Sequence, residues 1–187
     1  MHQHDLAPDD DLVILVDAHG HAIGTANRRE VHGSDTPLHL AFSCYLFDRR
    51  GRVLLTRRAL DKLTWPGVWT NACCGHPRPG EAPREAVRRR LNEELGLGVD
   101  DLRLVLPQFA YRATDASGVV ENELCPVWVA VVDTDPTPNP AEVADLAWVD
   151  WSAAVSAAGA APFLLSPWSA LQIPLLDDVF STEGLLA

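Results

Sequence analysis

The sequence predicts a mixed α/β protein in which helices cover a central mixed β-sheet. Two observations favour this class. Strand-like stretches interleave with helical ones along the chain, and residues 38–47 alternate side chains between two faces while residues 82–95 carry apolar residues at helical spacing. The 187 residues suit one core and contain no repeat or linker. We therefore expect a single domain over residues 1–187, with residues 1–10 as a loose tail in which His2 and His4 are solvated.

The strands follow from alternation and from the turns that bound them. On residues 38–47, Leu38, Leu40, Phe42, Cys44 and Leu46 share one face, and His39, Ala41, Ser43 and Tyr45 share the other. The turn "DRRG" makes this strand and the next one a hairpin, and residues 65–80 are expected to form a loop. The predicted strands cover residues 11–17, 38–47, 52–59, 119–132 and a short stretch around 146–151.

Three helices are predicted. The clearest covers residues 82–95, with Pro83 in its first turn and Gly96 just past its end. Its apolar stripe consists of Val87, Leu91 and Leu95. Ser152 is expected to cap a second helix, and an apolar helix past Trp168 closes the chain.

Charge and hydropathy exclude several classes of partner. The net charge of -11 argues against nucleic acid, since binding a phosphate backbone requires many Lys and Arg residues. No apolar run approaches the roughly 20 residues that cross a bilayer. The N-terminus is polar and acidic, unlike a signal peptide, so we expect a cytoplasmic protein without a membrane partner. A small anion remains possible because Arg57, Arg58 and Lys62, the only lysine, lie close together.

The four cysteines do not predict a disulfide framework. A cytoplasmic setting keeps thiols reduced. Cys73 and Cys74 are adjacent, and their Cα separation of about 3.8 Å is short of the range that an unstrained disulfide spans. The chain has no Cys-x-x-Cys pair, so a structural zinc ribbon is poorly supported.

Two carboxylates and three histidines are candidate metal ligands. Glu121 and Glu123 are two residues apart on a predicted strand, so they share a face and repel each other. If this face is buried, a metal ion is the simplest way to relieve the repulsion. If the face is exposed, the two carboxylates are solvated at a strand edge. The spacing alone leaves both alternatives open. With His32, His39 and His76 they form a nitrogen and oxygen donor set that suits manganese, iron, zinc or magnesium.

The segment from Gly75 to Gly96 resembles the Nudix box. The spacing from Gly75 to Glu81, Arg89 and the final glutamates follows the pattern. Arg90 departs from it, because a glutamate of the hydrolytic metal cluster normally stands there. Arg90 and Glu94 lie one helical turn apart, and this charge reversal should weaken a hydrolytic metal cluster.

The motifs "LHLAFSCYLF", "TRRALDKLTWPGVWTNACCGHPRPGE", "YRATDASGVVENELCPV" and "SPW" together resemble the type 1 isopentenyl-diphosphate isomerases over most of residues 12–168. The resemblance implies a Nudix-like fold and interconversion of isopentenyl and dimethylallyl diphosphate. It also implies a metal site for manganese, zinc or magnesium, with the ligands His32, His39, His76, Glu121 and Glu123.

By the same resemblance, Cys74 is the catalytic cysteine and Glu123 its acidic partner, with Tyr111 assisting proton delivery and Trp168 facing a carbocation. A weakly basic double bond needs such a positioned acid, and a cation needs protection from water. Which of the two groups donates first is left open. Cys73 has no counterpart role and is expected to pack in the core.

The resemblance further implies a diphosphate site, with Arg28, Arg58, Lys62 and Arg90 as contacts and a Mg²⁺ ion that bridges the diphosphate to Glu94. At position 28 the family commonly has a lysine, and arginine changes geometry more than charge.

We expect a monomer with a small diphosphate as its partner. The alternatives are a Nudix hydrolase, against which Arg90 and Cys74 argue, and a non-catalytic metal-binding domain, which would leave Cys74 and Trp168 unexplained.

Overall fold

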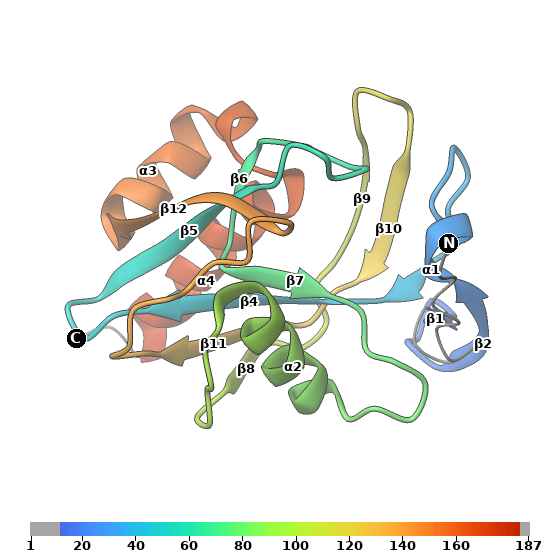
Figure 1. The fold of residues 1–187 in the computed structure, drawn as a ribbon, viewed down its shortest axis with the longest axis horizontal. Coiled ribbons are helices and arrows are strands. Elements are labelled where there is room, and N and C mark those ends of the chain that lie inside the picture. Colours follow the sequence, from blue (N-terminus) through green and yellow to red (C-terminus); the bar gives the residue numbers. More distant parts are fainter. Residues whose placement is uncertain (1–11, 184–187) are drawn as a thin grey trace, which may run out of the picture.

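The computed structural model describes residues 12–183, so the expected tail with His2 and His4 lies outside the described residues. Within this part of the chain the strands form two sheets (Figure 1). The five-stranded sheet has the order β2 (Ala22–Asn27), β1 (Leu12–Val16), β3 (His39–Leu40), β10 (Val120–Leu124) and β9 (Ala110–Thr114). The seven-stranded sheet has the order β12 (Val143–Asp150), β5 (Arg52–Arg58), β4 (Phe42–Phe47), β11 (Val127–Val131) and β8 (Arg103–Leu106), with β6 (Trp69–Thr70) on β5 and β7 (Cys73–Gly75) on β4.

Helices cover both faces of the seven-stranded sheet, as the sequence predicted for its central sheet. Phe42, Cys44 and Leu46 of β4 point into a core shared with Leu91 of α2. Tyr45 and Phe47, the alternate residues of β4, point into a second core under α3 and α4. The helices are α1 (Arg28–Val31), α2 (Pro83–Leu95), α3 (Trp151–Ala160) and α4 (Pro167–Glu183), with a 3₁₀ turn at Pro162–Leu164.

Two predicted strands each divide between the two sheets. The stretch 38–47 breaks at Ala41 into β3 and β4, and the stretch 119–132 breaks at Cys125 and Pro126 into β10 and β11. The backbone N–H of Ala41 donates to the carbonyl of Leu124 at 2.9 Å, so the breaks lie side by side. Pro126 has no N–H to donate to a ladder, which makes it a suitable residue at the point where the strand leaves its sheet. The predicted mixed α/β class is confirmed, and the structure adds a second mixed sheet to the central one.

Other boundaries differ from the prediction for local reasons. The expected loop over residues 65–80 contains the short strands β6 and β7, because neighbouring strands β5 and β4 supply their hydrogen bonds. α3 begins at Trp151 with Asp150 as its N-cap, so Ser152 lies inside the helix. β2, α1, β8 and β9 were not foreseen. The helix at 82–95 is confirmed to within a residue, and Gly96 ends it in the left-handed conformation at φ 65°.

No helix in residues 12–183 combines the length and the apolar character that crossing a membrane requires.

The packing of α4 predicts which leucines stabilise the fold. Leu176 is fully buried in the core under α3 and α4, whereas Leu171 on the same helix is 54% exposed. We expect Leu176→Ala to lower the free energy of unfolding by about 2–5 kcal/mol, because the mutation removes buried methyl groups and leaves a cavity. Leu171→Ala, the matched control, should change it by less than about 0.5 kcal/mol. Urea unfolding followed by circular dichroism measures both, and equal losses would contradict the packing described here.

Candidate active site

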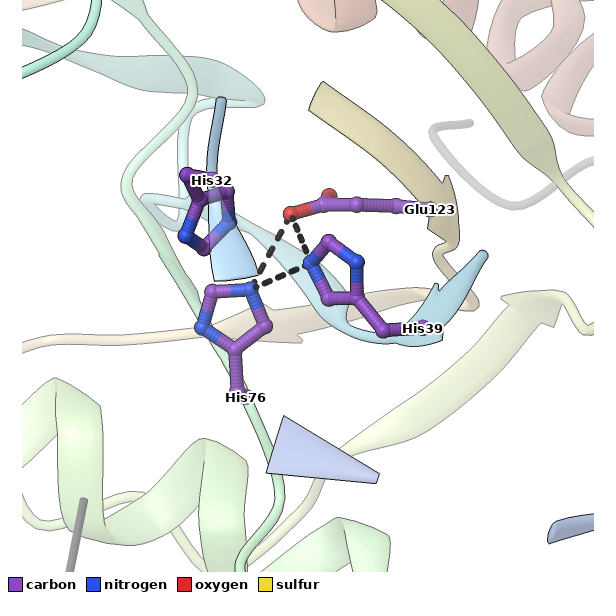
Figure 2. Close-up of side chains that lie close together, drawn as sticks. All are labelled: His32, His39, His76 and Glu123. Atoms are coloured by element: carbon purple, nitrogen blue, oxygen red, sulfur yellow. Dashed lines mark hydrogen bonds and ion pairs between the residues drawn. The ribbon is translucent and has the colours of Figure 1, made fainter. Parts of the chain in front are cut away.

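Three histidines and a glutamate from four separate segments point toward one another (Figure 2). His32 follows α1, His39 lies on β3, His76 follows β7 and Glu123 lies on β10. One ligand atom from each lies within 4.8 Å of the others. Nε2 of His76 is 3.2 Å from Nε2 of His39 and 3.1 Å from Oε1 of Glu123. This group can therefore hold one metal ion.

The hydrogen bonds of two histidines leave their inner nitrogens free to bind a metal. Nδ1 of His32 donates to the carbonyl of Arg28 at 2.9 Å, and Nδ1 of His39 donates to the carbonyl of Pro37 at 3.0 Å. A carbonyl only accepts, so in the neutral rings the proton is on Nδ1 and the lone pair on Nε2. Backbone carbonyls commonly fix metal-binding histidines in this way.

Glu121, the fifth predicted ligand, lies at the edge of this group. Its Oε2 is 3.0 Å from Nε2 of His32, yet neither of these buried atoms has a hydrogen-bond partner. Buried polar atoms seldom remain unsatisfied, so two that face each other fit a site whose occupant satisfies both. The other carboxylate oxygen accepts a hydrogen bond from the hydroxyl of Thr64 at 3.1 Å, which holds Glu121 in place. The buried alternative for the Glu121 and Glu123 pair is thus correct, and the solvated strand edge is wrong.

Within the histidine and glutamate group, the histidines and the glutamates shift each other's pKa values against the effect of burial. Burial would raise the pKa of Glu123, but hydrogen bonds and charge from His39 and His76 outweigh it and hold this pKa well below its usual range. Burial lowers the pKa of His76 more than Glu123 raises it. For His32 the balance reverses: burial lowers its pKa, but Glu121, the Arg28 carbonyl and Glu123 together raise it by more. The neutral His76 and the ionised Glu123 are both in the form that binds a metal.

A cavity of about 360 Å³ adjoins this group and collects the other candidate residues. Cys74 and Glu123 both line it, so the predicted thiol and carboxylate face a common space. Burial raises the pKa of the Cys74 thiol to about 11, which keeps it protonated at neutral pH. Tyr111 and Trp168 line the same cavity, and their ring centroids are 5.7 Å apart. Tyr111 is opposite Glu123 in the β9–β10 pairing, which explains its place beside the carboxylate.

The predicted cations also lie around the cavity, and Lys62 and Arg90 share an acidic partner there. Arg28, Arg58, Lys62 and Arg90 all line it. The ammonium of Lys62 donates to Glu142 Oε2, and Nη2 of Arg90 donates to the same oxygen at 3.2 Å. Sequence reasoning missed Glu142, because it follows a loop rich in proline and matches no motif.

Glu94 lies at the far side of Arg90, in a smaller adjoining pocket that it shares with Glu142. Nε of Arg90 donates to Oε1 of Glu94 at 2.9 Å, as their one-turn spacing predicted. Burial raises the pKa of Glu94 more than Arg90 lowers it. Cys73 is 2% exposed within the core and its thiol contacts Glu94 at 3.6 Å, so it packs as expected.

The ion pair between Arg89 and Glu81, both in the segment that resembles the Nudix box, fixes the position of His76. Nε of Arg89 donates to Glu81 Oε1 at 2.8 Å, and its Nη2 donates to Glu81 Oε2 at 2.9 Å and to the carbonyl of His76 at 3.2 Å. A bidentate pair of this kind is among the stronger charged hydrogen bonds. It ties the loop that carries His76 to the side of α2.

The class of protein follows from the fold and from comparison with known families. A family model described as the NUDIX domain matches residues 37–170. Among solved structures, the MutT protein from Methanosarcina mazei Go1 superposes with a TM-score of 0.63 at 20% identity, covering 76% of this chain and 94% of that one. The shared fold and the matched segment are those of Nudix-domain proteins.

Two sequence relatives narrow the class. A protein from Frankia alni named isopentenyl-diphosphate Delta-isomerase is 62% identical over 164 residues, which cover 88% of this chain and 84% of the relative. One of the same name from Clavibacter michiganensis subsp. michiganensis is 57% identical over 177 residues, covering 95% and 91%. The chain belongs to the isopentenyl-diphosphate Delta-isomerase family, as its motifs predicted.

The histidine and glutamate group predicts metal retention. We expect the purified protein to keep a divalent transition-metal ion through dialysis, and His76→Ala to weaken its binding at least about tenfold, because an inner-facing ligand is lost. His21→Ala is the control, since the side chain of His21 is 77% exposed, pairs with Asp17 and is not a member of the histidine and glutamate group. Elemental analysis after dialysis measures retention. If the His76 variant keeps as much metal as the wild type, these histidines are held by hydrogen bonds alone.

Proposed function

We propose that this protein interconverts isopentenyl diphosphate and dimethylallyl diphosphate by adding a proton to one end of the allylic unit and removing one elsewhere. The observation that carries the proposal is that the Cys74 thiol and the Glu123 carboxylate line one cavity beside the metal-binding group. A carbon–carbon double bond is a very weak base, so it needs an acid held in place and a base to accept the second proton. Cys74 and Glu123 supply that pair.

Aromatic residues of the cavity are suited to the cation that protonation creates. Trp168 is 3% exposed, which keeps bulk water from its ring. An aromatic face attracts a cation electrostatically, and exclusion of water prevents its capture. Burial raises the pKa of Tyr111 well above its usual value, and the charge of Glu123 adds to this effect. Its hydroxyl therefore stays protonated beside Glu123 and can pass a proton toward it.

The diphosphate is proposed to bind Arg28, Arg58, Lys62 and Arg90. Arg58 is held ready, since its Nε and Nη2 donate to the carbonyl of Thr64 at 3.1 and 2.9 Å. To contact the substrate, Lys62 and Arg90 would exchange their ion pairs with Glu142 for the diphosphate oxygens. Glu94 and Glu142 would then lose their cationic partners and repel the diphosphate unless a divalent cation enters with it. This supports Mg²⁺ beside Glu94.

The second ion is proposed to be Mn²⁺, Zn²⁺ or Mg²⁺ at His32, His39, His76, Glu121 and Glu123, a donor set that suits these metals. When bound, this ion would stabilise the carboxylate charge of Glu123, and Mg²⁺ would neutralise the diphosphate. The protein residues do the rest: they orient the substrate, exclude water and exchange protons with it.

Hydrolysis of a diphosphate is the alternative that shares this fold. It requires a carboxylate cluster on α2, but Arg90 occupies one of those positions and neutralises Glu94 instead. A non-catalytic metal-binding domain would not need a thiol beside a lined cavity. The isomerase is therefore the better explanation of Cys74 and Trp168.

We further propose that the enzyme acts as a cytoplasmic monomer, without a nucleic-acid or membrane partner. All four cysteines are unpaired, as in a reducing compartment.

The reaction class is tested by product analysis. Incubated with isopentenyl diphosphate, Mg²⁺ and Mn²⁺ or Zn²⁺, the protein should form dimethylallyl diphosphate and release no phosphate, because no P–O bond is broken. In D₂O the product should acquire deuterium from the solvent, since a proton is added and another removed. NMR and a phosphate assay measure these outcomes. Orthophosphate or a monophosphate product would instead indicate the hydrolase.

The adjacent thiols give a matched test of the catalytic residue. Cys74→Ala should lower kcat by at least about 10²-fold, the smaller end of what a positioned acid or base contributes. Cys73→Ala should retain kcat within about threefold, although its packing loss lowers stability by on the order of 1 kcal/mol. Steady-state kinetics on both variants decide the point. An equal loss of kcat in the two would show that the wrong thiol was chosen.

A further inference from the structure

A buried amide joins the thiol and the indole beneath the cavity. Asn71, in the turn between β6 and β7, is fully buried. Its Oδ1 accepts hydrogen bonds from Sγ of Cys74 at 3.2 Å and from Nε1 of Trp168 at 2.9 Å. One oxygen atom is thus the common acceptor for two residues that lie far apart in sequence.

The orientation of this amide is fixed. Its Nδ2 donates to the carbonyls of Cys44 at 3.0 Å and Cys73 at 2.7 Å. Carbonyls only accept, so exchanging the oxygen and nitrogen of the amide would break both bonds. The Asn71 backbone N–H also donates to the Ser169 hydroxyl at 3.0 Å. Oδ1 must therefore face Cys74 and Trp168.

A second polar group touches the same sulfur. Ser43 is opposite Cys74 in the β4–β7 pairing, and its Oγ lies 3.5 Å from Sγ. Nε2 of Gln172 donates to Oγ of Ser43 at 3.0 Å, and the hydroxyl of Tyr45 donates to Oε1 of Gln172 at 3.0 Å. Because Gln172 is the donor to this Oγ, the Ser43 hydroxyl keeps its own proton for a hydrogen bond and can donate it to the sulfur of Cys74 or to that of Cys125 at 3.4 Å.

We propose that Asn71 and Ser43 are positioning residues for the isomerisation: Asn71 sets the Cys74 thiol and the Trp168 ring in one geometry, and Ser43 holds the sulfur from the other side. The inference rests on the proposed function of Cys74. A thiol attached only through its own Cβ would rotate among rotamers. A misplacement of about 1 Å in a catalytic group can cost about 10²-fold in rate.

The first test is the split between kcat and KM. Asn71→Ala should lower kcat about 100-fold and change KM for isopentenyl diphosphate less than about threefold, since the side-chain hydrogen bonds described for Asn71 go to the thiol, the indole and backbone carbonyls rather than to the proposed diphosphate residues. Thr70→Val is the matched control: Thr70 is also buried and its hydroxyl donates to the same Oδ1 at 2.9 Å, but its other hydrogen bonds go to the hydroxyls of Ser166 and Ser169 rather than to the thiol or the indole. It should retain kcat within about threefold.

The second test does not depend on activity. The Trp168 indole N–H, assigned by its loss in Trp168→Phe, should move upfield in the ¹⁵N–¹H spectrum of Asn71→Ala with Mg²⁺ present, because its acceptor is gone. In Thr70→Val the resonance should stay in place. A general loss of stability, which urea unfolding would measure, would not shift the Trp168 indole N–H resonance selectively.

If Asn71→Ala does not fold, Ser43→Ala decides the proposal. It should lower kcat about tenfold at constant KM, while Tyr45→Phe, which removes a hydroxyl two hydrogen bonds further from the sulfur, keeps kcat within about twofold. If the wild type is active and Asn71→Ala is fully active as well, this inference alone is overturned. If Asn71→Ala does not fold, full activity of Ser43→Ala overturns it in the same way. A wild type without isomerase activity would overturn the proposed function itself.

Discussion

The parallel pairing of two bent strands is the constraint on which the site depends. β3 pairs with β10 in one sheet, and directly afterwards β4 pairs with β11 in the other. The register sets His39 beside Glu123 and Tyr111 beside Glu123. A slip of one residue would turn each of these side chains to the opposite face of its sheet. The bend then brings the cavity-lining faces of the two sheets together, because neither strand could supply residues to both sheets if it were straight.

The protein buries charged groups at the site and compensates each one locally. Glu121, Glu123 and Glu94 are all buried, although ionised carboxylates are costly to remove from water. Histidines face the first two, and Arg90 binds the third. On a chain of net charge -11, the seven arginine and lysine residues that line the cavity also favour a local positive potential where an anionic substrate is expected.

Part of the Nudix box has a structural role in this protein. Glu81 and Arg89 still tie the box loop to α2 and thereby position His76. At the next position, where the box pattern has a glutamate, Arg90 provides a cation that reaches Glu94 and Glu142. One fold can therefore host different chemistry when a few side chains at its site change sign, which is why the fold alone does not define the reaction.

The sequence by itself determined the helix at 82–95 and the hairpin after residue 47. Its motifs also identified the candidate residues of the site. Apolar periodicity and turn residues are local signals, and the motifs are long enough to be specific. Only the tertiary structure decided that the long strands bend into two sheets, that Glu121 is buried, and that Glu142 holds Lys62 and Arg90. It alone revealed Asn71 as the link between Cys74 and Trp168, because hydrogen bonds between residues 97 positions apart leave no periodic trace in the chain.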